Sequence, residues 1–259
     1  GNVRGLFRYI QPSGAVRDLS VEGWIDPTDR KNTLGGIAGS NQGLLSNCSF
    51  HGTVRGADYI GGLVGTNEST GQIINCTFSG AVTGEHYVGG IAGQNGGSII
   101  RCANSGSINT TEVDAELNLD NLNQEQLNAA ENVPVCTDIG GITGFSSGIL
   151  QSCVNTGAVG YAHVGYNIGG IAGRQSGYLN GCTNSGTILG RKDVGGIVGQ
   201  LVPEVRLLYN EGQVGDLLDE LDVLRGLIDQ TGDDVRGASD EISERMQAIS
   251  DRAGEAQEA

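Results

Sequence analysis

Charged and chemically reactive side chains are scarce in this sequence of 259 residues. Only 17% of the residues are charged, and histidine occurs three times. His51, His86 and His163 stand alone in the sequence, so the paired histidines of a zinc peptidase helix are absent. Cysteines also come singly, which argues against a zinc site built from closely spaced pairs. We therefore expect no metal site and no cofactor.

Basic side chains are the second shortage. Lysine and arginine number 15 against 30 acidic residues, and the excess acid lies mainly in residues 216–259 and 110–137. A chain without a basic groove does not suit a phosphate backbone, so we expect no nucleic acid partner. Long apolar runs are missing too, which predicts no direct membrane insertion by this chain. There is no initiating methionine, and we expect a piece of a larger protein.

Glycine, by contrast, is abundant, with 45 residues. Six pentapeptides begin with a double glycine and end with glycine, at residues 35–39, 61–65, 89–93, 140–144, 169–173 and 195–199. Their starts lie 26, 28, 51, 29 and 26 residues apart. A nearly fixed period in this range is typical of proteins built from stacked repeats.

Each period contains three short apolar stretches bounded by glycine, asparagine or serine, which are strand lengths and turn residues. One such turn cannot bury its apolar face alone, so successive turns must stack. The pattern predicts an all-β fold, a three-sided parallel β-solenoid of about seven coils over residues 1–215. The usual crossover rule makes this β-helix right-handed.

Aligning the periods places one cysteine per coil in a single column: Cys48, Cys76, Cys102, Cys153 and Cys182. Leucine occupies this position in the first and last coils, at Leu19 and Leu208, so we interpret the cysteines as buried apolar side chains. Disulfides between coils are the alternative, because stacked coils bring Cα atoms to a bridgeable spacing. Cys136 lies outside the column and is the thiol we expect to be most accessible.

A second column holds an asparagine two residues after the cysteine, at Asn104, Asn155 and Asn184. Stacked asparagines can hydrogen-bond along the repeat axis, as they do in other stacked β structures. Phe50 and Phe78 take this position in two earlier coils, where aromatic stacking would serve instead. We interpret both sets as structural ladders.

The column just before the double glycine is the candidate site. Its members are Tyr59, Tyr87, Asp138, Asn167 and Asp193, and His86 adjoins it. Stacked tyrosines suit sugar rings or a protein partner, so we treat Tyr59, Tyr87, His86, Asp138 and Asp193 as candidate binding residues. Asp138 and Asp193 would lie about 10 Å apart, near the upper limit for an inverting glycosidase pair. Solvated turn residues explain the same column, and we assign no catalytic residue.

Two segments depart from the repeat. Residues 110–137 lengthen one connection and are rich in helix formers, so we expect an acidic α-helical insertion there. From residue 216 onward, apolar side chains recur at alternating steps of four and three, which is the pattern of a coiled coil. The segment 216–259 is therefore expected to be an acidic helical domain. It would either associate with another chain through residues 217–249 or fold back over the open end of the solenoid.

Two of the repeat units resemble the GLUG repeat family: GGIAGQNGGSIIRCANSGSI, and GGLVGTN with its continuation GQIINCTFSGAV. The resemblance extends over residues 5–215 apart from the insertion. That family occurs in bacterial surface and secreted proteins, so the resemblance implies an extracellular or cell-surface location. It supplies no catalytic residues.

We expect a non-enzymatic extracellular bacterial surface module for adhesion, ligand display or spacing. Its partner would be a host or matrix glycan or protein. A polysaccharide-cleaving β-helix enzyme and a purely structural stalk are the two alternatives.

The heptad pattern generates a first prediction. If residues 217–249 form a two-stranded coiled coil, light scattering of the full chain gives a dimeric mass, and deleting residues 216–259 restores the monomeric mass. A monomer at high protein concentration would contradict this packing and favour a helix that folds back.

Overall fold

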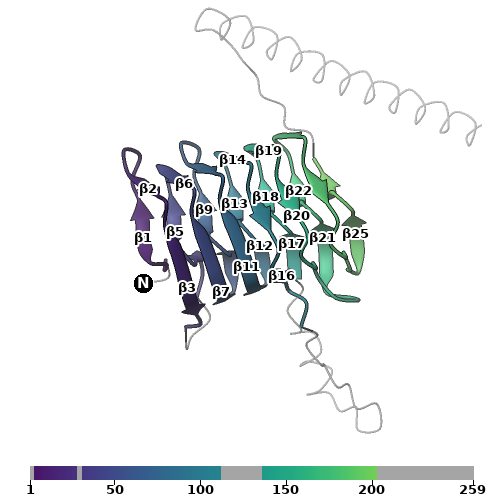
Figure 1. The fold of residues 1–259 in the computed structure, drawn as a ribbon. Helices are drawn as coiled ribbons and strands as arrows, with labels where there is room; N and C mark the ends of the chain where they lie inside the picture. Colours follow the sequence, from purple (N-terminus) through teal and green to yellow (C-terminus); the bar gives the residue numbers. More distant parts are fainter. Residues whose placement is uncertain (1–2, 28–30, 112–135, 203–259) are drawn as a thin grey trace, which may run out of the picture. The chain divides into compact units, whose positions relative to one another are not determined.

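The computed structural model describes residues 3–27, 31–111 and 136–202. These ranges form 26 short strands and no helix, and the strands stack in parallel along one axis (Figure 1). The described residues make about six turns of a β-solenoid, one fewer than expected. The difference lies at the end of the chain, because the seventh turn contributes only its first two strands before residue 203.

The strands assemble into four sheets, which we call sheets A to D in the order in which each turn visits them. Sheet A contains β4 (Leu34–Gly35), β8 (Asp58–Gly61), β12 (His86–Gly89), β17 (Cys136–Gly140), β21 (Gly165–Gly169) and β25 (Lys192–Gly195). Sheet B contains β1 (Phe7–Ile10), β5 (Ala38–Asn41), β9 (Val64–Asn67), β13 (Ala92–Asn95), β18 (Thr143–Ser146), β22 (Ala172–Gln175) and β26 (Val198–Leu201).

Sheet C contains β2 (Ala15–Arg17), β6 (Leu44–Ser46), β10 (Gln72–Ile74), β14 (Ser98–Ile100), β19 (Ile149–Gln151) and β23 (Tyr178–Asn180). Sheet D contains β3 (Ser20–Ile25), β7 (Ser49–Arg55), β11 (Thr77–Thr83), β15 (Ala103–Asn104), β20 (Val154–Asn155) and β24 (Thr183–Asn184). The strand β16 (Ser107–Ile108) pairs with the second half of β11.

The prediction of three sides is therefore wrong, because each turn has four. The extra side arises at the double glycine, which the sequence pattern placed inside a single strand. In the structure, Gly61 ends β8 and Val64 begins β9, so the glycines form a corner between sheets A and B. Glycine has no side chain, so the sequence pattern at a double glycine does not distinguish a corner from a strand.

The core is a set of inward columns, each of which repeats one apolar position from turn to turn. Fully buried columns include Ile37, Leu63, Ile91, Ile142 and Ile171 after the double glycine, and Leu45, Ile73, Ile99 and Leu150 in sheet C. Burying one such side chain contributes roughly 1.5–3 kcal/mol. The columns thus supply the stability that no single turn of about 26 residues could supply alone.

Close approach between coils explains the double glycine. A Cβ added at Gly62 would meet the carbonyl oxygen of Gly90 in the next coil and the ring of Phe78. Only glycine leaves room for this backbone-to-backbone contact.

The expected helical insertion at 110–137, the C-terminal helix and the final coil around Leu208 lie almost wholly outside the described residues, in the ranges 112–135 and 203–259. The boundary expected at residue 215 lies there too. These remain predictions from the sequence.

The glycine corner generates a second prediction. Gly62→Ala forces a methyl group against the Gly90 carbonyl, and we expect it to lower the free energy of unfolding by about 1–3 kcal/mol. Gly96→Ala is the matched control, because its added Cβ meets nothing closer than 3.6 Å. Urea unfolding followed by circular dichroism measures both variants. Equal midpoints for the two variants would contradict the close-contact explanation.

Candidate binding corner in sheet A

The candidate column lies in sheet A and has an unusual backbone. Thr33, Tyr59, Tyr87, Asp138, Asn167 and Asp193 all have positive φ angles, between 53° and 60°. This left-handed conformation costs an ordinary L-residue about 1–2 kcal/mol, whereas asparagine and aspartate adopt it more readily. Tyrosine is an unfavourable choice at such a position. Its presence in two successive coils therefore needs a compensating interaction or a function.

Part of the compensation is aromatic stacking. The rings of Tyr59 and Tyr87 are nearly parallel, with centroids 4.8 Å apart and an interplanar angle of 10°. Phe145, from the neighbouring sheet B, lies tilted 6.4 Å from Tyr87, and the Arg174 guanidinium covers the Phe145 ring at 4.6 Å. The result is a continuous, partly exposed aromatic surface across the corner.

Burial, followed by smaller effects of Tyr87 and the Asp58 carboxylate, raises the pKa of the Tyr59 phenol. Tyr59 therefore remains a neutral hydroxyl at physiological pH. It can donate a hydrogen bond to a ligand that lies on the ring surface.

Asp138 occupies the same column but is buried, with an exposed fraction of 4%. Asn167 donates its amide to one carboxylate oxygen at 2.9 Å, and Arg174 donates to the other at 3.2 Å. The Arg174 Nε also lies 3.1 Å from Asp138, which completes an ion pair. Both oxygens of Asp138 are thus engaged by the protein itself. Asp193, on β25, is exposed.

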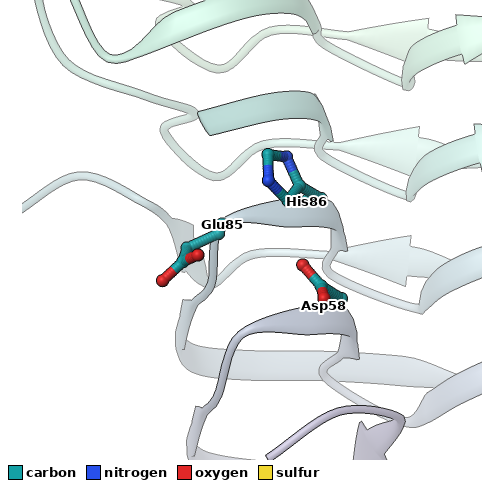
Figure 2. A group of neighbouring side chains, drawn as sticks. All are labelled: Asp58, Glu85 and His86. Carbon is teal, nitrogen blue, oxygen red and sulfur yellow. The ribbon is translucent and has the colours of Figure 1, made fainter. Parts of the chain in front are cut away.

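His86 belongs to a cluster that the sequence analysis missed. Asp58, Glu85 and His86 each place one potential metal-ligand atom within 4.8 Å of the other two (Figure 2). Asp58 and His86 are register partners on adjacent coils, and Glu85 immediately precedes β12. The 28-residue step from Asp58 to His86 is the repeat period, so aligning the polar columns, as was done for the apolar ones, would have found this pair.

The cysteine column lies in the core. Backbone N–H groups of Cys48 and Cys76 donate to the sulfur of the next cysteine at 3.4 Å, and Cys153 donates likewise to Cys182. None of the six cysteines forms a disulfide. The first four members of the column are buried, whereas Cys182 is partly exposed; Cys136 lies outside the column and is also partly exposed.

Two amide ladders run through the solenoid. Asn104 donates to Asn155 at 2.7 Å, and Asn155 donates to Asn184 at 2.8 Å. A second ladder, which the sequence analysis missed, links Asn41, Asn67 and Asn95 through 2.8 Å hydrogen bonds. It occupies the ends of sheet B strands, where the asparagines resembled ordinary turn residues. Phe50 and Phe78 are stacked with an interplanar angle of 7°.

Comparison with known families finds a match for the two turns that carry Tyr59 and Tyr87. Residues 56–83 and 84–109 each match the GLUG motif. The chain contains GLUG repeats. Both stacked tyrosines and all three members of the Asp58, Glu85 and His86 cluster lie within these two GLUG repeats. No curated protein and no solved structure gives a significant match. In the part of the chain that the structure describes, no helix is long and apolar enough to cross a membrane.

The cysteine column generates a third prediction. Burial raises the pKa of the Cys102 thiol, and the hydrogen bond to Cys182, together with burial, raises that of Cys153. Because the thiolate is the reactive form, native protein treated with a thiol reagent is labelled at Cys136 and Cys182 but not at Cys102 or Cys153. Denatured protein is labelled at all six positions. Mass spectrometry locates the label, and rapid native labelling of Cys102 would contradict the buried-column assignment.

Proposed function

We propose that this chain is a non-enzymatic module of a bacterial cell surface that serves adhesion, ligand display or spacing. The aromatic corner of Tyr59 and Tyr87 is its contact surface. One observation carries the proposal: two tyrosines occupy left-handed positions where the same column elsewhere holds threonine, asparagine or aspartate.

Stability alone is a weak reason for these tyrosines. An aromatic pair contributes about 0.5–1.5 kcal/mol beyond the area it buries. Two left-handed tyrosines cost about 2–4 kcal/mol relative to a relaxed backbone, at 1–2 kcal/mol each. Asparagine, as at Asn167, fills the same position with less strain. A contact role for the partly exposed rings accounts for the choice of tyrosine.

The environment of Asp138 supports the non-enzymatic assignment. A general acid or base must be able to exchange a proton with its substrate. The Asp138 carboxylate is instead buried and bound by Asn167 and Arg174. Its neighbours hold it as an ion pair that supports Phe145 and the tyrosine stack.

The chemistry of the corner, together with the GLUG repeats, supports the proposal of an extracellular partner. Stacked rings flanked by hydrogen-bonding groups suit the apolar faces and hydroxyls of sugar rings. We therefore propose a host or matrix glycan, or a glycosylated protein, as the partner.

The fourth prediction tests the corner. The variant Tyr59→Asn with Tyr87→Asn installs the residue that Asn167 already places in this column, so we expect it to remain folded. Binding on a glycan array and to immobilised matrix glycoproteins should fall at least tenfold, about 1.4 kcal/mol.

Tyr178→Ala is the matched control, because Tyr178 is an exposed tyrosine on sheet C, away from the corner. We expect its binding to equal that of the wild type. Full binding by the double variant would refute the corner as contact surface. Absence of binding by the wild type would favour a purely structural stalk.

A further inference from the structure

The corner between sheets D and A holds a cluster of metal-ligating groups that the aromatic surface does not use. Asp58 begins β8, Glu85 lies in the turn before β12, and His86 begins β12. Their three candidate ligand atoms lie within 4.8 Å of one another, and all three residues are partly buried. Figure 2 shows the three side chains gathered at this turn, with the imidazole on the coil beyond Asp58.

The carboxylate of Asp58 is poorly satisfied by the protein. Its Oδ1 atom is shielded from solvent and has no hydrogen-bond partner among the described residues. A shielded carboxylate oxygen without a donor loses its hydration without compensation, at a cost in stability. A cation bound at this position would supply the missing interaction.

The histidine is held in an orientation that suits a ligand. His86 Nδ1 lies 3.0 Å from the hydroxyl of Thr137, its register partner on the following coil. When Nδ1 carries the proton and donates it to Thr137, Nε2 keeps its lone pair. Metal-bound histidines characteristically use their second ring nitrogen in this way, which fixes both the tautomer and the ring orientation.

We propose that Asp58, Glu85 and His86 form a site for a divalent transition-metal cation, with Zn²⁺ as the best-matched ion. Two carboxylates and one imidazole are the ligand types that zinc accepts at about 2.0–2.2 Å, and three protein ligands leave a fourth position open. The imidazole disfavours Mg²⁺ and Ca²⁺, which prefer oxygen ligands.

Formation of the site requires only a small closure. Ligand atoms of a tetrahedral zinc site lie about 3.4 Å apart. The present limit of 4.8 Å therefore needs movements on the order of 1 Å among the three side chains. The ion would join two successive GLUG repeats, because Asp58 comes from the first and the other two ligands from the second. This inference does not rest on the binding role of the tyrosines.

Titration calorimetry of the full, chelator-treated chain with ZnCl₂ tests the site. The wild type is expected to bind one Zn²⁺ more tightly than its acidic surface binds further ions, and more tightly than Mg²⁺ or Ca²⁺. Its thermal midpoint should rise with zinc concentration, because a ligand that binds the folded state stabilises it. Asp58→Asn and His86→Gln should each weaken this binding at least tenfold and abolish the thermal shift.

Thr137→Val tests whether His86 is a metal ligand that Thr137 orients or a histidine with only a structural role. It removes the hydroxyl beside Nδ1 without touching the ion, and loss of such an outer partner weakens metal binding about 10–100-fold. His51→Gln is the matched control: His51 Nδ1 also contacts a hydroxyl, that of Ser79 at 2.8 Å, but His51 belongs to no metal-ligating cluster among the described residues.

Cys136→Ser addresses an alternative ligand, because the Cys136 thiol lies 3.7 Å from the carbonyl oxygen of Gly84, the residue before Glu85. We expect unchanged zinc binding. Circular dichroism of each variant without zinc verifies the fold. Wild-type affinity in both Asp58→Asn and His86→Gln would overturn the proposal, as would loss of the site in Cys136→Ser or in His51→Gln. If one ligand variant fails to fold, the other decides the outcome.

Discussion

In-register stacking of successive coils is the constraint on which the rest of this structure depends. Each strand pairs in parallel with the strand one period earlier and one period later, so most side chains lie directly against their own counterparts. A position is then acceptable only if its side chain can pack against a copy of itself. Apolar side chains, amides and small residues meet this condition, and like charges do not.

The buried columns show three solutions to this condition. Isoleucine, leucine and valine form apolar layers, and cysteine forms a buried column of its own, in which Leu19 takes the first position. Asparagine satisfies its amide by donating to the next asparagine and accepting from the previous one, which allows a polar group with an exposed fraction near zero, as at Asn67. The ladders therefore allow a polar side chain to be buried in the core, because its amide is hydrogen-bonded.

Specific chemistry arises where the columns change composition. The column of Asp58 continues through His86 and Thr137, so a carboxylate, an imidazole and a hydroxyl follow one another on three successive coils. The next column places Tyr59 above Tyr87 and then changes to Asp138, whose ion pair with Arg174 joins it to Phe145. A regular scaffold thus presents a few side chains that differ from the rest of their column, at a spacing set by the stacked coils. The stacked tyrosines and the proposed metal site share the same two GLUG repeats for this reason.

The sequence by itself determined the stacked all-β architecture, its period, the cysteine and asparagine columns, and the alignment of Tyr59 with Tyr87. These follow from periodicity, because any in-phase residue must stack. It did not determine the number of sides, since glycine has no side chain whose orientation could reveal the corner between Gly61 and Val64. Nor did it reveal the cluster of Asp58, Glu85 and His86, because Glu85 lies out of column with the other two. Glu85 lies in the turn before β12, so only the folded turn between sheets D and A brings its carboxylate within 4.8 Å of the other two ligand atoms.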